Sequence, residues 1–221
     1  MANDLSTLSL AAAGIGFLHC VGGPDHYLPF VAMSRVGVWS LRKTLLVTTI
    51  CGIGHVIGSA LLGLLGIAAG VLVYEMQDTL DPFVKFESGR GNMAAWLLVL
   101  AGVVYCVWGV SRGHHHHGNE AVDEPSTLER ITPWVLFTIF AFGPCEPLIP
   151  LLMYPAAKVS LLSVVFVTAV FGATTLLTMT VIVAIMHRGL QNVRLTWLEH
   201  YRHAAAGFVL VACGIAMILG L

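Results

Sequence analysis

The stretch His19-Cys20-Val21-Gly22-Gly23-Pro24-Asp25-His26 places two imidazoles and a carboxylate inside an otherwise apolar part of the chain. Pro24 has no backbone N–H and follows two glycines, so we expect a regular helix to break there. Ionisable groups in an apolar, membrane-length segment are costly, and by default they mark a functional site. Imidazole together with carboxylate favours a divalent transition metal ion such as nickel, cobalt, copper or zinc. The alternative is that these groups only stabilise the break through hydrogen bonds.

The composition of the whole chain is that of an integral membrane protein. Hydrophobic residues make up 57% of the 221 residues, charged residues make up 10%, and the mean hydropathy is +0.85. Because an ordinary soluble domain has roughly 25% charged residues, a soluble globular protein and a disordered chain are excluded. The net charge of −1 leaves no basic patch for a nucleic-acid partner. The lipid bilayer is therefore the first expected partner.

The hydrophobic pattern predicts an all-α membrane protein with six transmembrane helices, each of about 20 residues. The second apolar stretch is too long to stand upright in a hydrocarbon layer of about 30 Å, so we expect it to tilt strongly or to break at Gly52 and Gly54. The segment 74–93 is predicted to be an outer loop. The six predicted spans are 8–30, 44–73, 94–112, 132–156, 159–187 and 203–221.

An internal repeat is visible in the sequence. Gly23-Pro24-Asp25-His26-Tyr27-Leu28 aligns with Gly143-Pro144-Cys145-Glu146-Pro147-Leu148, and each segment opens a group of three apolar stretches. Since three is an odd number, the second half must enter the membrane from the opposite side. Two inverted three-helix repeats, with helices 1 and 4 broken, are typical of secondary transporters with a site near the midplane. We predict three regions: a first repeat at 1–112, a His-rich acidic cytoplasmic loop at 113–131 and a second repeat at 132–221.

Lys and Arg are distributed unevenly between the two sides of the predicted bundle. The side with the first, third and fifth connections holds eight of them, and the other side holds three, Lys85, Arg90 and Lys158. The positive-inside rule then places the eight in the cytoplasm of a bacterial-type inner (plasma) membrane, with both termini outside. The eight residues are Arg35, Arg42, Lys43, Arg112, Arg130, Arg188, Arg194 and Arg202.

A further candidate ligand lies in the second span. In Cys51-Gly52-Ile53-Gly54-His55 the cysteine and the histidine are four residues apart and share a helix face. His55 is a candidate metal ligand, and the alternative is a polar group that a neighbouring helix satisfies. Cys51 is expected to be a small core residue.

The second half and its preceding loop add other candidates. Cys145 and Glu146 follow the second Gly-Pro pair, and both are candidate ligands of the ion. Glu146 is expected to bind the ion or to carry a proton. The alternative for Glu146 is a carboxyl kept neutral by burial. The loop residues His114, His115, His116 and His117 form a tract typical of metal buffering or sensing, unless they are an engineered insertion.

Enzymatic motifs are absent from the sequence. There is no G-x-x-x-x-G-K-[ST] phosphate loop, no G-x-S-x-G elbow and no H-E-x-x-H zinc motif. We therefore expect no enzyme and no nucleotide-driven pump. Any transport must use an ion gradient, the membrane potential or a partner.

Taken together, His19, Gly23-Pro24-Asp25-His26, Cys51-Gly-x-Gly-His55 and Gly143-Pro144-Cys145-Glu146-Pro147-x-x-Pro150 resemble the UreH-like transmembrane family, which has a sulfite exporter-like description. That family is distantly similar to the NicO and NiCoT nickel/cobalt transporters, which carry H-x4-D-H; here five residues separate His19 from Asp25. The resemblance implies a carrier of nickel or cobalt, with His19, Asp25, His26 and His55 as the transferred positions. Asp25 is expected either to bind the ion or to orient a histidine. The ion is the cargo, and no prosthetic group is expected. A second copy and a metalloenzyme-maturation protein are candidate partners.

Two other functions remain open at the level of sequence. Pro144-Cys145-x-Pro147 is similar to a motif of the DsbD/CcdA thiol-disulfide electron carriers, which use a cysteine in each half. Here the residue equivalent to Cys145 in the repeat is Asp25, and Cys20 is the only nearby thiol. A sulfur-anion exporter is the third candidate, although the predicted site has two carboxylates and no Lys or Arg.

Overall fold

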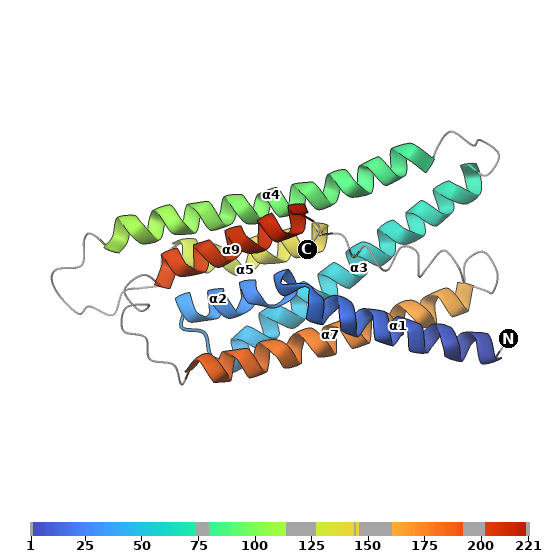
Figure 1. Cartoon of the computed structure of the whole chain (residues 1–221), viewed down its shortest axis with the longest axis horizontal. Helices are drawn as coiled ribbons and strands as arrows, with labels where there is room; N and C mark the ends of the chain where they lie inside the picture. The colour runs from blue at the N-terminus through green and yellow to red at the C-terminus, as the bar shows by residue number, and fades with distance from the viewer. Residues whose placement is uncertain are drawn as a thin grey trace.

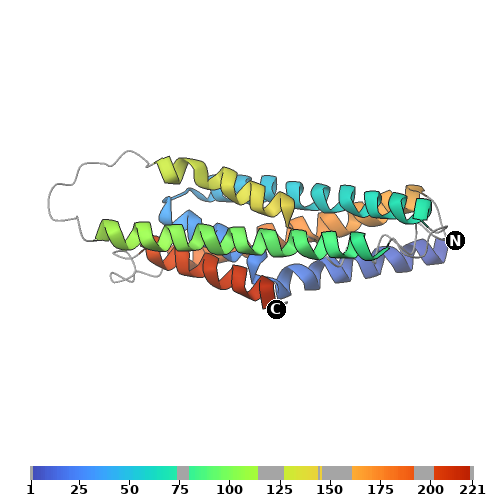
Figure 2. The same ribbon diagram turned by 90° about the horizontal axis from the view of Figure 1, so that it is seen from above.

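The elements in the described part of the chain are all helices, so the prediction of an all-α protein is confirmed. They lie along one long axis (Figures 1 and 2). The computed structural model describes residues 2–73, 80–113, 127–143, 145, 161–191 and 202–219. The elements are α1 Ala2–Gly22, the 3-10 helix η1 Pro24–His26, α2 Leu28–Val36, α3 Leu41–Val73, α4 Leu80–Gly113, α5 Thr127–Phe142, α7 Leu161–Gln191 and α9 Arg202–Leu219.

Four of these helices are long and apolar enough to cross a membrane. Their outward side chains are apolar: Leu10 is 76% exposed and Leu162 is 79% exposed. Exposing such an apolar surface to water is costly, whereas contact with lipid tails is not. α5 and α9 contribute shorter apolar segments, Ile131–Phe142 and His203–Leu219. The four candidate spans are Leu5–Gly22, Leu41–Leu61, Gly91–Ser111 and Leu162–Leu190.

The predicted break in the first span is confirmed. α1 ends at Gly22, and the N–H of Gly23 donates to the carbonyl of His19 at 3.0 Å, which closes the last turn. Pro24 begins η1, because proline suits the first position of a new helix but cannot donate the bond that would continue α1. α2 starts at Leu28 and continues in the direction in which α1 runs, away from the N-terminus (Figure 1).

Of the two alternatives predicted for the second span, a strong tilt or a break, the break does not occur. α3 continues without interruption through Gly52 and Gly54 and crosses the bundle obliquely (Figure 1). A Cβ atom on Gly52 would lie 2.5 Å from Leu176 Cδ2 of α7, and one on Gly54 would lie 2.8 Å from the Phe137 ring of α5. These glycines therefore allow close helix packing, which is a usual role of small residues in membrane helices.

The predicted outer loop at 74–93 is also wrong for its described part, because residues 80–93 form the start of α4. The apolar part of α4 agrees with the predicted third span, but the helix begins earlier. Polar residues keep a segment out of lipid, but they do not prevent it from forming a helix. For the same reason α5 begins at Thr127, inside the predicted loop 113–131.

Close pairing of helices holds the bundle together. α4 packs along α9, α3 packs against α5 and α7, and α1 packs against α7. We call four residues of the α4–α9 interface the glycine seam: Gly102, Gly109, Gly207 and Gly214. Their spacing of seven along each helix keeps them on one face, and a Cβ on any of them would lie 2.5–2.8 Å from a backbone atom of the partner helix.

Candidate metal centre

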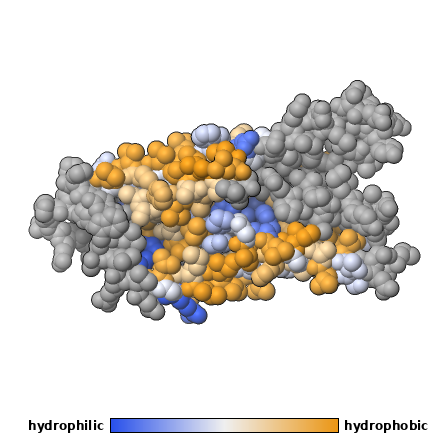
Figure 3. All heavy atoms as spheres, in the orientation of Figure 1, coloured by the Kyte–Doolittle hydropathy of each residue, from blue (hydrophilic) through white to orange (hydrophobic). Residues whose placement is uncertain are grey.

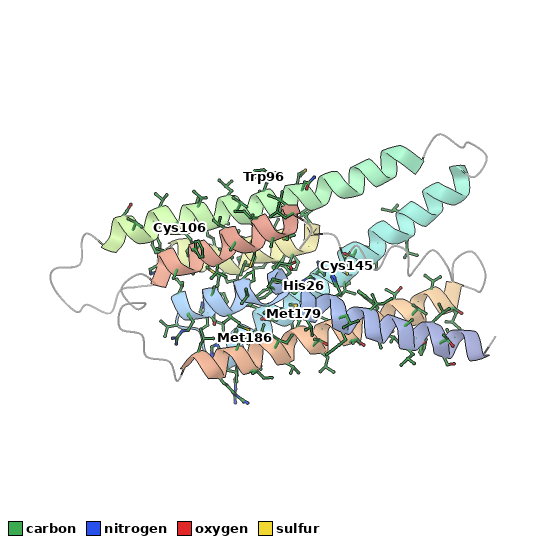
Figure 4. The ribbon with its side chains drawn as sticks, in the orientation of Figure 1. His26, Trp96, Cys106, Cys145, Met179 and Met186 are labelled. Carbon is green, nitrogen blue, oxygen red and sulfur yellow. The ribbon has the colours of Figure 1, made fainter. Side chains whose placement is uncertain are left out.

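Three histidines from three elements meet near the middle of the bundle, where Figure 4 labels His26. His19 lies in the last turn of α1, His26 ends η1, and His55 lies within α3. One ring nitrogen of each histidine lies within 4.8 Å of the others. The ring centroids of His19 and His26 are 4.5 Å apart and those of His26 and His55 are 5.4 Å apart. We call these three residues the histidine triad.

His26 is held by one of its ring nitrogens and leaves the other without a partner. Nδ1 lies 3.2 Å from the carbonyl oxygen of Gly23 and 3.2 Å from Oδ2 of Asp25. Both neighbours are acceptors, so Nδ1 carries the proton and donates to them, and in the neutral ring Nε2 keeps its lone pair. The Nε2 atom is buried and has no hydrogen-bond partner, in a residue that is only 4% exposed.

His55, which lies within α3, has the same arrangement of ring nitrogens, and its partner is at the end of α5. Its Nδ1–H donates to the carbonyl oxygen of Phe140 at 3.1 Å. That carbonyl belongs to the last turn of α5, where regular helical pairing stops, and it also accepts the backbone N–H of Gly143 at 3.2 Å. The Nε2 atom of His55 is again buried and without a hydrogen-bond partner. Two neighbouring rings thus present unpaired nitrogen lone pairs.

His19 completes the triad and connects it to a thiol. The Nε2 atom of His19 lies 3.5 Å from Sγ of Cys145, and its ring lies 6.4 Å from that of Phe171. The position of Cys145 is fixed through its backbone N–H, which donates to Oγ of Ser59 at 3.1 Å. Cys145 is buried, whereas His19 is half-buried.

The electrostatic surroundings of the triad favour a cation. The C-terminal ends of α1 and α5 converge on it from opposite ends of the bundle (Figure 1). Each helix C-terminus carries the equivalent of about −0.5 charge, and the carboxylate of Asp25 lies beside His26. Figure 3 shows a hydrophilic area midway along a largely apolar face, where the same view in Figure 4 labels His26.

The structure brings together several of the predicted site residues and favours one of the two predicted roles of Asp25. His19, His26 and His55 are adjacent, and Cys145 contacts His19. Asp25 touches the Nδ1 edge of His26, so it orients a histidine and lies away from the unpaired Nε2. The remaining predicted ligands, Glu146 and His114, His115, His116 and His117, lie outside the described residues.

Two partners of the centre were not predicted from the sequence. The carbonyl of Phe140 becomes available only because α5 ends at Phe142, and the sequence does not fix that end. Ser59, which holds Cys145, follows His55 by four residues on α3. Its spacing would have placed it on the same helix face.

The fold and the centre define a class: a helical, membrane-type protein with a cluster of three histidines, two of them buried and one half-buried. Comparison with models of known families, with curated proteins and with solved structures gives no match. Function is therefore inferred from the residues and their geometry.

Proposed function

We propose that this protein carries a divalent transition metal ion across a bacterial inner membrane, with nickel or cobalt as the expected cargo. The observation that carries this proposal is the pair of buried Nε2 atoms of His26 and His55 that have no hydrogen-bond partner. Neutral imidazole nitrogen is the commonest protein ligand for such ions. The choice of nickel or cobalt comes from the resemblance to the NicO and NiCoT transporters.

Metal binding removes an energetic cost that the bare site carries. A buried polar atom without a partner costs about 1–3 kcal/mol, and His26 and His55 each bear one such atom in rings 5.4 Å apart. A bound ion accepts both lone pairs. The Nδ1 atoms are held by a carbonyl or a carboxylate, which is the usual support for metal-binding histidines.

Transport, rather than storage, is favoured by the arrangement of the helices around the triad. Exchanging α1 with α5, α3 with α7 and α4 with α9 maps the α1–α7 contact onto the α3–α5 contact and leaves the α3–α7 and α4–α9 contacts unchanged. The two members of each exchanged pair also run in opposite directions (Figure 1). This symmetry supports six spans in two inverted repeats with a site at their interface.

The orientation follows from the positive-inside rule. Arg35 at the end of α2, Arg42 and Lys43 at the start of α3, and Arg188 at the end of α7 belong to one end of the bundle (Figure 1). We infer that this basic end faces the cytoplasm and that both termini face outward.

The two alternative functions receive less support. A sulfur-anion exporter would need positive charge at its site, whereas the triad has a carboxylate and two helix C-termini beside it. A thiol-disulfide carrier needs two thiols that can exchange a disulfide. Cys20 and Cys145 pack in separate core clusters, and neither is in a disulfide.

The test is transport of radioactive nickel and cobalt into liposomes that contain the purified protein. His26→Ala and His55→Ala should abolish transport, while His203→Ala, which replaces a buried histidine of α9 outside the triad, should not. The double change Cys20→Ser with Cys145→Ser should lower transport at most in part. If the histidine changes are silent and the double cysteine change alone abolishes function, the carrier proposal is wrong.

A further inference from the structure

Cys145 brings a sulfur atom to the edge of the histidine triad. Its side chain is 1% exposed, and its Sγ atom lies 3.5 Å from Nε2 of His19. The bond from its backbone N–H to Ser59 fixes the residue against α3, on the same helix that carries His55. The thiol of Cys145 therefore contacts a ring that belongs to the triad.

We propose that Cys145 supplies the fourth ligand of the bound ion, as a thiolate, so that the site is four-coordinate with three nitrogens and one sulfur. This inference rests on the proposed metal-binding function and specifies its chemistry. When the ion binds, the S–H bond breaks, its proton leaves to the aqueous phase, and the sulfur electron pair bonds to the metal.

The positions of the other polar groups favour sulfur as the fourth ligand. Asp25 is the other anionic side chain described beside the triad, but its Oδ2 atom faces Nδ1 of His26. Nδ1 and Nε2 lie on different edges of the imidazole ring, so Asp25 contacts His26 on the edge away from the nitrogen that would bind the ion. The Nε2 atoms of His26 and His55, both more than nine-tenths buried and without a partner, independently mark where the ion lies.

The distances fit a site that contracts when the ion enters. Zinc–nitrogen bonds of about 2.0–2.1 Å and a zinc–sulfur bond of about 2.3 Å in a tetrahedron place the ligand atoms roughly 3.3–3.6 Å apart. The triad nitrogens lie within 4.8 Å of one another, and the sulfur lies 3.5 Å from His19. Inward movement of roughly 1 Å per histidine side chain therefore brings the three nitrogens to these separations, and the distance from the sulfur to His19 already matches.

This donor set defines the class of cargo. Imidazole and thiolate together bind zinc and tetrahedral cobalt(II) well and bind magnesium, calcium and manganese poorly, because the latter ions prefer oxygen ligands. Of the two expected ions, cobalt suits a tetrahedral site better than nickel, which in nitrogen and oxygen sites prefers a square-planar or tetragonal arrangement. Of the proposed cargo ions we therefore expect the carrier to prefer cobalt(II) to nickel, and we expect zinc to bind at the same site.

The experiment uses the full chain in detergent, with His114, His115, His116 and His117 replaced by Ala so that the tract cannot bind metal. Cobalt(II) chloride is added, and the absorption spectrum is recorded. Four-coordinate cobalt with a thiolate ligand should give intense visible bands and a sulfur-to-cobalt charge-transfer band in the near ultraviolet. Cys145→Ser should lose the charge-transfer band and bind cobalt at least about tenfold more weakly, whereas the control Cys51→Ser should keep both.

A second measurement does not depend on any cysteine variant. X-ray absorption at the zinc edge of the zinc-loaded protein should detect one sulfur at about 2.3 Å together with nitrogen neighbours. Weak, six-coordinate cobalt bands, a charge-transfer band that survives in Cys145→Ser, or zinc without a sulfur neighbour would overturn the four-ligand inference and leave the histidine site standing. If cobalt does not bind, or binds unchanged in His26→Ala, the proposed function itself fails.

Discussion

The glycine seam and the histidine triad are built by opposite uses of buried space. Along the seam, α4 and α9 approach until backbone meets backbone, and a Cβ on Gly207 would lie 2.5 Å from the backbone N of Cys106. At the triad, two ring nitrogens are buried without any partner. The seam fills its buried space with closely packed backbone atoms, whereas the triad leaves two buried ring nitrogens without a hydrogen-bond partner. We infer from this difference that the seam stabilises the bundle and that the triad is suited to a ligand.

This comparison predicts that changes in the two regions have separable effects. A larger side chain in the seam should destabilise the fold and alter metal binding only through loss of folded protein. An apolar replacement in the triad should abolish binding and leave the fold close to its original stability.

The largest effect is expected for Gly207→Leu in the seam. The new side chain would meet backbone atoms of α4 at Gly102 and Cys106, and these atoms cannot move aside as a flexible side chain can. We expect a loss of about 3 kcal/mol or more of stability, measured by thermal unfolding in detergent. Gly14→Leu is the matched control, because nothing lies within 4 Å of a Cβ at that position. Equal melting temperatures for the two variants would show that the seam does not hold the helices together.

The second effect is expected for His55→Leu in the triad. The substitution removes a buried unpaired nitrogen and one hydrogen bond to the Phe140 carbonyl, which keeps the Gly143 N–H as a donor, so the changes in stability nearly cancel to within about 1 kcal/mol. Affinity for cobalt should fall at least about 100-fold, which corresponds to about 2.7 kcal/mol. Calorimetric titration measures the binding and thermal unfolding measures the stability. A variant that unfolds like Gly207→Leu would remove the distinction between the two regions.

The sequence predicted the triad better than it predicted the packing. Polar residues in apolar spans are conspicuous, so His19, His26 and His55 could be chosen without a structure, and Pro24 located the break. The role of Gly52 and Gly54 could not be predicted, because a glycine that breaks a helix and one that admits a neighbour look alike in sequence. Their difference lies in side chains of α5 and α7, which are distant in the chain.

The function of Asp25 was likewise open between two alternatives. Its sequence position allowed it to bind the ion or to orient a histidine. The contact between its Oδ2 atom and Nδ1 of His26, at 3.2 Å, favours orientation. The carbonyl partner of His55 could not be predicted at all, since it depends on the residue at which α5 ends.

A smaller effect is expected for Asp25→Asn, which sharpens the comparison within the triad itself. The amide oxygen can still accept a hydrogen bond from Nδ1 of His26, but the negative charge that strengthens the ring as a ligand is lost. We expect cobalt affinity to fall about tenfold, at the low end for such supporting residues. Calorimetric titration beside His55→Leu checks this order. A loss as large as that of His55→Leu would indicate that Asp25 is itself a ligand.

The smallest effect is expected for Ser59→Ala. Only the hydrogen bond from the Cys145 backbone to Ser59 is removed, which is worth about 1 kcal/mol, so affinity should fall roughly fivefold. Ser111→Ala is the control, because that hydroxyl is exposed and donates to a carbonyl of its own helix. If both serine variants bind cobalt like the unchanged protein, the position of Cys145 does not matter for binding.

The central claim is that one divalent ion binds to His19, His26 and His55, and equilibrium dialysis tests it most directly. The full chain is purified with His114, His115, His116 and His117 replaced by Ala and is dialysed against nickel or cobalt. We predict one ion bound per chain, and none after the triad residues are also replaced by Ala, with the melting temperature of the metal-free protein preserved. Undiminished binding in the variant without the triad, or no binding before its removal, would contradict the claim.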